Sequence, residues 1–309
     1  MEELEGYSVV PLQQLVYKNA YILILNRDWM PALKIVMKYI PEDRIFCNCW
    51  PWNFTKGKCV ACENTKLLAG PGYFYPFLVE RMFLGEEKRT RAMYCPKCGI
   101  CYSEYRPNDD EMDRLYEGYR DSKYQKQRQK YEPEYTEAFN RELYAPSDGG
   151  EGKRERIFKY ISDQITLSNC HNILDYGGDR GQFIPGQFVN AKKYVYEISH
   201  PTVIDGIELI EDKMQLRNIK WDVIFCNQTL EHLSEVKTYF TELVSYMSEG
   251  TLLYIEVPND RPVDYYDPIF FHEHINHFSL ETFKNMAKAN GAKMIKGDVG
   301  GVIRCIIKK

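Results

Sequence analysis

The chain has 309 residues, and 44% of them are apolar, which is enough to fill a core and excludes wholesale disorder. Its 40 basic and 44 acidic residues leave a net charge of −4, so nucleic acid is a disfavoured partner. The apolar runs are too short to cross a bilayer, and the acidic N-terminus lacks the pattern of a secretory signal. We therefore expect no membrane span and a cytoplasmic location, where ten cysteines need a reason other than disulfides.

Residues 1–46 predict a small β-α-β add-on unit. A strand-like apolar run at 20–26 precedes a helix-like stretch at 31–40, and a second short apolar run follows at 44–47. The segment has no phosphate-binding glycine pattern, so we interpret it as a structural layer.

The next segment, residues 47–107, holds most of the cysteines. Cys59 and Cys62 form one Cys-x-x-Cys pair, and Cys95 and Cys98 form another. Two such pairs can bring four thiolates into a tetrahedron, which is the geometry that zinc prefers. We predict a zinc-binding module, with a structural ion because the protein fills all four positions. Three further cysteines remain as substitute ligands: Cys47, Cys49 and Cys101.

Residues 108–150 are highly charged and rich in tyrosine. Their charges are mixed in sign, which favours a solvated helical connector over a nucleic-acid arm. Three of the tyrosines fit a solvated face, with the covering of a substrate as the alternative: Tyr116, Tyr119 and Tyr124.

From residue 151 onward, apolar strands alternate with amphipathic helices. This alternation predicts an α/β domain over residues 151–309, with a parallel sheet covered by helices on both faces. Only a Gly-Gly turn joins the last two strands, so we expect that pair to be antiparallel.

A glycine-rich turn, ILDYGGDRGQF at 173–183, follows the first strand of this domain. Glycines let the backbone approach a ligand closely, and the N-terminus of a following helix carries partial positive charge. Glu197 ends the next strand, where a carboxylate can hold the two ribose hydroxyls of a nucleoside. The turn residues placed to line such a ligand are Asp175, Gly177, Gly178 and Gly181.

The order of the motifs resembles that of the class I S-adenosylmethionine-dependent methyltransferases. These motifs are ILDYGGDRG, YVYEIS, WDVIFCNQTLEHL, GTLLYIEVPN and a closing β-hairpin. The resemblance implies a Rossmann-like seven-stranded sheet, with S-adenosylmethionine as the cofactor. It also implies these contacts: Asp175, Gly177 and Gly181 along the methionine and ribose, Glu197 on the ribose hydroxyls, and Asn227 at the cofactor's edge. The family's middle glycine is Asp179 in this chain.

Three histidines crowd into one loop, FFHEHINHFS at 270–279. The loop follows the strand at 251–257, at the carboxyl edge of the sheet, where open α/β proteins place their sites. Histidine and glutamate are the usual proton-transfer groups near neutral pH. A metal bound within the loop is an alternative, with these ligands: His272, Glu273, His274 and His277.

The same loop is similar to one in the sugar C-methyltransferases of deoxysugar pathways and in related polysaccharide-cluster methyltransferases. Their Tyr-x-Glu-His pattern, followed by Phe-Ser, matches residues 271–274 and 278–279, with Phe271 in place of the tyrosine. The resemblance implies Glu273 and His274 as an acid/base pair, and His232 of the TLEHL motif is a second candidate base. That group also carries an N-terminal zinc-binding module, which YCPKCGICYSEYRPNDDEMDRLY resembles.

Together the resemblances imply methyl transfer from S-adenosylmethionine to a sugar, a nucleotide sugar or a surface-polysaccharide component. Two alternatives stay open. In one, the acceptor is RNA or protein and the cysteine module reads it. In the other, the chain is a non-catalytic zinc-containing binding protein whose cofactor site has decayed, and Asp179 and Phe271 favour that view.

Overall fold

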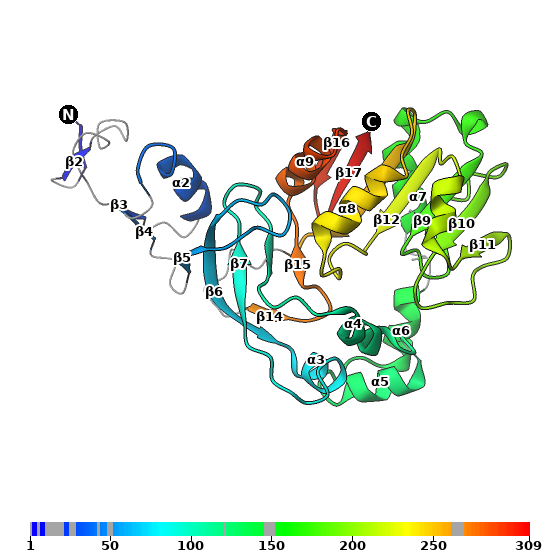
Figure 1. Cartoon of the computed structure of the whole chain (residues 1–309), viewed down its shortest axis with the longest axis horizontal. Coiled ribbons are helices and arrows are strands. Elements are labelled where there is room, and N and C mark those ends of the chain that lie inside the picture. Colours follow the sequence, from blue (N-terminus) through cyan, green and yellow to red (C-terminus); the bar gives the residue numbers. More distant parts are fainter. Residues whose placement is uncertain are drawn as a thin grey trace.

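The computed structural model describes residues 2–4, 7–9, 22–24, 29–41, 44–47, 52–119, 121–144, 152–260 and 269–309. Figure 1 shows a smaller sheet, which contains β6 and β7, beside a larger sheet, which contains β9 to β12. The short helices α3 to α6 lie below the two sheets in this view. Within the described ranges, every helix is too short or too polar to span a membrane.

The larger sheet has seven strands in the order β11-β10-β9-β12-β13-β17-β16. The five strands from β11 to β13 are parallel to one another, whereas β17 is antiparallel to both β13 and β16. This arrangement confirms the predicted α/β fold with a closing antiparallel hairpin. Its strands are β9 (Asn172–Tyr176), β10 (Lys192–Tyr196), β11 (Ile207–Ile210), β12 (Val223–Asn227), β13 (Leu252–Pro258), β16 (Lys293–Val299) and β17 (Val302–Lys308).

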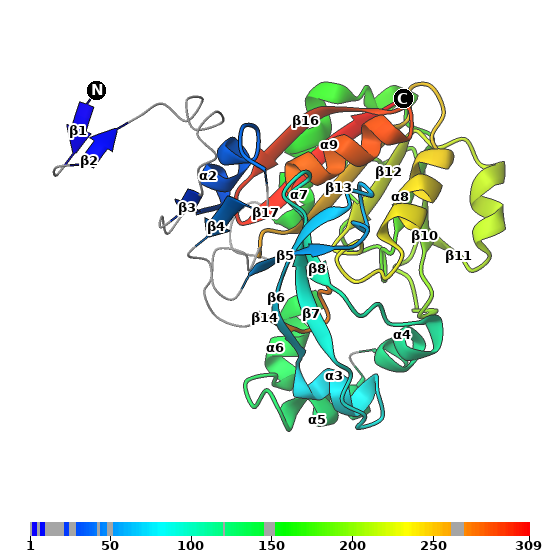
Figure 2. The same ribbon diagram turned by 60° about the vertical axis from the view of Figure 1, so that its left-hand side comes forward.

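Helices cover both faces of this sheet, which explains why its central strands are continuous apolar runs. α8 (Val236–Ser245) and α9 (Leu280–Ala289) share one core with Leu174 and Ile224 of the strands. α7 (Lys153–Ile161) packs on the other face, against the alternate strand residues such as Ile173. Figure 2 shows α8 and α9 side by side on one face of the sheet.

The smaller sheet has the order β14-β6-β7-β8-β15, and β5 pairs with β6. Its two edge strands come from the far end of the chain, because β14 is parallel to β6 and β15 is antiparallel to β8. Those late strands satisfy backbone groups that the edges of β6 and β8 would otherwise leave open. The strands are β5 (Asn53–Lys56), β6 (Lys66–Phe74), β7 (Thr90–Tyr94), β8 (Cys101–Ser103), β14 (Ile269–Phe271) and β15 (Asn276–His277).

The histidine loop is therefore built into the smaller sheet, although its sequence lies inside the 151–309 segment. A domain boundary placed only along the sequence, at residue 150, does not separate the two sheets. The physical reason is that a strand finds its partner by hydrogen bonding and burial, whatever its distance along the chain.

The N-terminal region contains a β-α-β unit in its described residues. β3 (Ile22–Ile24) and β4 (Ile45–Cys47) pair in parallel, and α2 (Trp29–Val36) connects them. A separate antiparallel pair precedes it, β1 (Glu2–Leu4) and β2 (Tyr7–Val9). Cys49, one of the substitute zinc ligands, lies outside the described residues.

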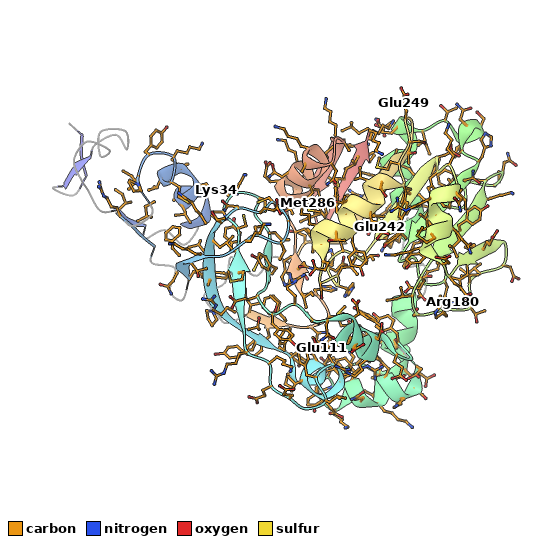
Figure 3. The ribbon with its side chains drawn as sticks, viewed as in Figure 1. Lys34, Glu111, Arg180, Glu242, Glu249 and Met286 are labelled. Atoms are coloured by element: carbon orange, nitrogen blue, oxygen red, sulfur yellow. The ribbon has the colours of Figure 1, made fainter. Side chains whose placement is uncertain are left out.

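Four short helices form the layer below the sheets: α3 (Pro76–Arg81), α4 (Asp109–Tyr116), α5 (Ser122–Gln129) and α6 (Glu137–Tyr144). α4 begins with a reciprocal capping box between Asn108 and Glu111, and the latter is labelled in Figure 3. The expectation that Tyr124 faces solvent is wrong, because its side chain is fully buried. It packs against Phe77 of α3 and the ring of Tyr135, so the layer has an aromatic core of its own.

Candidate active site

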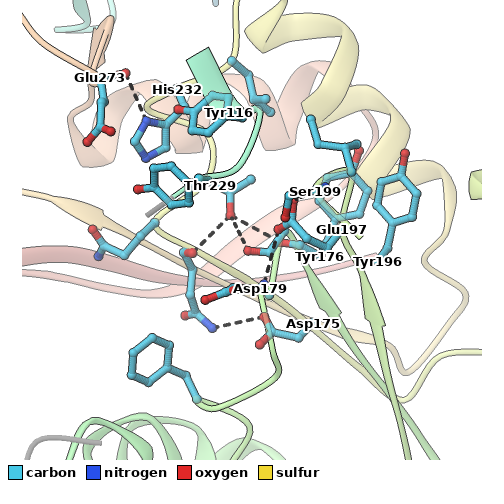
Figure 4. A pocket seen from close by; sticks show the side chains of 18 of the residues that line it. Tyr116, Asp175, Tyr176, Asp179, Tyr196, Glu197, Ser199, Thr229, His232 and Glu273 are labelled. Atoms are coloured by element: carbon cyan, nitrogen blue, oxygen red, sulfur yellow. Dashed lines mark hydrogen bonds between the residues drawn. The ribbon is translucent and has the colours of Figure 1, made fainter. Parts of the chain in front are cut away.

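One cavity of about 710 Å³ opens at the carboxyl edge of the larger sheet. It is bounded by the glycine turn after β9, the end of β10, the loop after β12, the histidine loop and the helical layer (Figure 4). Its size lies within the range of small-molecule sites. The sequence-predicted residues in its lining are Asp175, Gly177, Gly178, Glu197, Asn227, His232, Glu273 and His274.

The glycine turn needs glycine at two positions. Gly177 has a φ of +71°, and a Cβ there would lie 2.5 Å from Cγ2 of Thr229. Gly181 has a φ of +78°, and its Cβ would lie 2.5 Å from Cδ1 of Ile207. Gly181 does not line the cavity, so the structure supports a role in packing against Ile207 and not the predicted contact with the cofactor.

Two polar side chains meet beneath the turn. Asp175 lies near the end of β9 and is only 1% exposed, and it accepts a 3.5 Å hydrogen bond from the amide of Asn227 at the end of β12. Burial raises the pKa of Asp175 to about 7, although Lys153 and Asn227 act in the opposite direction. The pair therefore forms a buried polar floor to this part of the cavity.

Glu197 lies beside the glycine turn, close to Asp179, as Figure 4 shows. Its carboxylate accepts hydrogen bonds from the backbone N–H groups of Asp179 (3.3 Å) and Ser199 (3.2 Å). Burial raises its pKa above the usual value, and these hydrogen bonds oppose that shift. The two backbone bonds hold the carboxylate in place at the strand end.

Asp179 occupies the position of the family's middle glycine, with a φ of +49°. Aspartate is among the residues that tolerate this left-handed conformation. Its Oδ2 accepts a 3.2 Å hydrogen bond from Gln182, and both Asp179 and Glu197 line the same open cavity. The side chain narrows the site without filling it.

The histidines of the loop diverge. Nε2 of His272 is 2.6 Å from Oε1 of Glu132, and the ring of His272 stacks on Phe77. His277 is in strand β15, and its Nδ1 is 3.0 Å from Oδ1 of Asp260. Of the three, only His274 lines the cavity. The alternative of a metal held by the four loop residues is wrong for the described structure, since they do not converge on one point.

Glu273 is held as a fixed anion. Its carboxylate accepts a hydrogen bond from the hydroxyl of Tyr124 and a 3.2 Å bond from Arg128. Burial alone would raise the pKa of Glu273, but Arg128 and the nearby histidines outweigh it and lower the value to about 2. A carboxylate so strongly stabilised in its charged form is a poor proton acceptor at neutral pH.

His232 and His274 stand together at the far end of the cavity from Glu197. Nδ1 of His232 is 3.0 Å from the backbone oxygen of Glu273, and Nδ1 of His274 is 2.8 Å from Oδ2 of Asp260. The two rings are 4.9 Å apart between centroids. Burial lowers the pKa of His274, but Asp260 and Glu231 outweigh this effect and raise it above the usual value.

The loop that carries His232 is braced from the smaller sheet. Asn276 of β15 donates from its amide to the carbonyls of Leu230, Glu231 and Leu233 at 2.8–3.2 Å. Arg106 donates to Oδ1 of Asn276 at 2.8 Å and to the carbonyls of Leu233 and Ser234. Because Asn276 is two residues from His274, these bonds fix the loop of His232 relative to the loop of His274.

Sequence patterns pointed to His232 but missed two neighbours that shape this corner. Glu231 precedes it in the same TLEHL motif and is 1% exposed, and Asp260 follows β13. A glutamate next to a histidine is common in surface helices, so only the three-dimensional structure reveals that this one is buried.

The four predicted cysteines lie together in the turns that follow β5 and β7 of the smaller sheet. Sγ of Cys59 is 3.7 Å from that of Cys98, and Sγ of Cys62 is 3.6 Å from that of Cys95. A tetrahedral zinc with bonds of about 2.3 Å places its sulfurs roughly 3.8 Å apart, so the four thiols fit such an ion. Cys101 is buried in strand β8 and is not part of this group.

A family model described as a methyltransferase domain matches residues 109–296, which is more than half of the chain and includes the connector helices. A search of curated proteins finds no match. An O-methyltransferase family protein from Burkholderia thailandensis is 13% identical with a TM-score of 0.40, and the alignment covers 60% of this chain and 62% of that one. This chain thus spans about three fifths of that structure's length.

Two further solved structures show a similar level of likeness. An S-adenosylmethionine-dependent methyltransferase from Clostridium acetobutylicum is 11% identical, with a TM-score of 0.41 and coverage of 57% of this chain and 98% of that one. Magnesium protoporphyrin IX methyltransferase from Synechocystis is 12% identical, with a TM-score of 0.41 and coverage of 56% and 92%. On the family match over residues 109–296, the chain belongs to the methyltransferase domain family, a family of enzymes.

Proposed function

We propose that this enzyme transfers a methyl group from S-adenosylmethionine to a sugar, a nucleotide sugar or a surface-polysaccharide component. The observation that carries the proposal is the single cavity that joins the glycine turn and Glu197 at one end to His232 and His274 at the other. A cofactor and an acceptor bound in one cavity can be aligned for in-line transfer, which is most of what the reaction needs.

At the cofactor end, Gly177 and Gly178 let the backbone approach the methionine part, and Glu197 binds the ribose hydroxyls. Asp175 and Asn227 form the floor below, and Asn227 lies at the cofactor's edge. The cofactor supplies an activated methyl group on a sulfonium, and the chain's residues bind and orient it.

At the acceptor end, we assign His232 and His274 to the removal of the acceptor's proton. Glu273, which the loop resemblance pairs with His274, takes a positioning role, because its backbone oxygen holds Nδ1 of His232 and its carboxylate is paired with Arg128. Phe271, where the resembling enzymes have tyrosine, is fully buried and packs on Phe74, so a hydroxyl there would not reach the cavity without rearrangement.

Aromatic side chains from the helical layer support a sugar-like acceptor. Tyr116, Tyr119 and Phe139 line the cavity, and the ring of Tyr116 lies 6.0 Å from that of His232 between centroids. Such rings offer apolar faces, and the tyrosines add a polar hydroxyl. The hydroxyl of Tyr116 is buried and, in the part of the chain that the structure describes, has no hydrogen-bond partner. An acceptor hydroxyl can satisfy it.

We also propose a structural zinc bound by Cys59, Cys62, Cys95 and Cys98, as the centre of a module over residues 47–107. The amide of Asn64 lies 3.6 Å from Sγ of Cys95 and supports the thiolate charge. With four protein ligands, the ion has no open position for a substrate.

The test is incubation with methyl-labelled S-adenosylmethionine and a panel of nucleotide sugars. We expect label transfer to at least one member, and at least a hundredfold loss in His232→Ala and His274→Ala with binding of S-adenosylhomocysteine retained. His171→Ala, an exposed histidine outside the cavity, is the matched control. Unchanged transfer in both site variants would refute the proton-removal role, and failure to bind cofactor at millimolar concentration would refute the function.

A further inference from the structure

Glu231 is a buried carboxyl group that lacks hydrogen-bond partners among the described residues. It follows β12 in the loop that also carries His232, and only 1% of its surface is exposed. Neither of its carboxylate oxygens has a hydrogen-bond partner among the residues that the structure describes. Buried carboxylates are costly unless they are paired or bind a metal, so this side chain indicates a ligand at its position.

Two imidazoles converge on this carboxylate. Nε2 of His232 is 4.0 Å from Oε1 of Glu231, and ligand atoms of Glu231, His232 and His274 all lie within 4.8 Å of one another. Each imidazole turns its Nδ1 to an acceptor, which is the Glu273 carbonyl for one and the Asp260 carboxylate for the other. Metal-binding histidines typically hold their second nitrogen in this way, with Nε2 directed at the ion.

We propose that Glu231, His232 and His274 bind a divalent first-row transition cation at the acceptor end of the cavity. Two imidazoles and one carboxylate form a donor set suited to such ions and unlike the four thiolates of the cysteine cluster. Three protein ligands leave coordination positions open, and both imidazoles line the cavity in which the acceptor would bind.

This inference rests on the proposed function and narrows its acceptor to one that presents an oxygen to the cation. Coordination lowers the pKa of a bound hydroxyl, as it does for water. In this arrangement the cation replaces His232 and His274 as the group that activates the acceptor, because an imidazole nitrogen bound to the cation cannot accept a proton. The hydroxyl proton leaves to solvent, the oxygen forms its bond to the methyl carbon, and the carbon–sulfur bond breaks with its electron pair kept by sulfur. The products are the methyl ether, S-adenosylhomocysteine and one proton.

The experiment is a titration of the zinc-loaded full-length protein with Mn²⁺, followed by electron paramagnetic resonance, and with Zn²⁺, followed by equilibrium dialysis. We expect one cation per chain beyond the thiolate site. Glu231→Gln, His232→Gln and His274→Gln should each weaken that binding by at least tenfold, whereas the exposed His171→Gln should not change it. Binding of neither cation at millimolar concentration, or equal binding by wild type and the three variants, would overturn the proposal.

A second measurement guards against variants that fold poorly. A cation that binds the folded state raises the Tm, so Mn²⁺ should raise the Tm of wild type and of His171→Gln. Adding Mn²⁺ should not change the Tm of Glu231→Gln, because that substitution removes the carboxylate ligand. The variant should still fold, because glutamine keeps the shape of the side chain. An equal rise in Glu231→Gln would contradict the assignment.

Binding of S-adenosylhomocysteine, measured by calorimetry on the same preparations, separates this inference from the function on which it rests. Cofactor binding without a second cation refutes only the metal site. A second cation without cofactor binding refutes the proposed methyl transfer and leaves the metal site standing.

Discussion

Gly177 lies in the turn that lines the proposed cofactor end of the cavity, and its backbone conformation leaves little choice of residue. Its φ of +71° costs other residues about 1–2 kcal/mol, and the side chain of Thr229 occupies the space that a Cβ would need. The conformation and the contact together make this glycine a requirement of the turn.

We expect Gly177→Ala to weaken binding of S-adenosylhomocysteine by about tenfold or more, which corresponds to roughly 1.4 kcal/mol. Calorimetry measures the change. Gly186→Ala is the matched control, since its Cβ would meet no described atom within 4 Å and its φ is not positive. Equal affinity in the two variants would show that the turn does not contact the cofactor.

Asp175 predicts a pH-dependent stability, because burial raises its pKa from 3.8 to about 7. The folded state binds this proton more tightly than the unfolded state does. The stabilisation is therefore fully present below pH 3.8 and is lost as the pH rises through about 7. The full change is at most about 4 kcal/mol, at about 1.4 kcal/mol for each pKa unit.

Asp175→Asn is neutral at every pH and should remove this dependence. We expect the free energy of unfolding of the cofactor-free variant, relative to wild type, to increase between pH 5 and pH 8. Urea unfolding at several pH values gives the comparison. Parallel pH profiles for the two proteins would mean that the carboxyl is not buried as the structure has it.

At the scale of elements, the smaller sheet connects the cysteine cluster to the rest of the molecule. Helix α9 begins with a capping box in which Ser279 and Thr282 cap each other, and both hydroxyls also donate to the carbonyl of Cys98, at 2.7 and 2.9 Å. A Cβ on Gly99 would lie 2.7 Å from Oγ of Ser279. The second cysteine pair is thus docked on the start of a helix of the larger sheet.

The sequence predicted these elements better than it predicted their partners. The amphipathic helices after residue 150, the paired cysteines and the closing hairpin all follow local patterns of periodicity, spacing and turn residues. The pairing of β14 and β15 with the smaller sheet does not, because those strands are very short and their neighbours lie far away along the chain. The burial of Tyr124 could not be predicted for the same reason, because the neighbouring residues of its polar helix do not indicate the aromatic side chains from other segments that cover it.

At the scale of the whole molecule, the two sheets share one apolar core. Buried residues near the cysteine cluster, such as Ile100 and Met93, belong to the same core as Leu243 of α8 and Phe283 of α9. Figure 1 shows the smaller sheet beside this helical face. Removal of the proposed zinc should therefore destabilise more than the module that binds it.

We expect Cys98→Ser to lose zinc and to lower the Tm of the entire chain in one cooperative transition, by about 2–4 °C for each kcal/mol lost. Circular dichroism and metal analysis measure the two effects. Cys170→Ser, a cysteine outside the cluster, should keep the zinc of the four-cysteine site. Two separate transitions, with the larger sheet unaffected, would show that the shared core does not couple them.

Local residue order is enough to specify the central strands of the larger sheet, the glycine turn, the position of Glu197 after the next strand and the spacing of the four cysteines, because each depends on backbone conformation or on spacing within a few residues. Tertiary contacts alone brought Glu231 and His232 against His274, paired Glu273 with Arg128 and turned His272 and His277 away from the cavity. The reason is that charge, burial and ligand geometry at this corner arise from segments that meet only when the chain is folded.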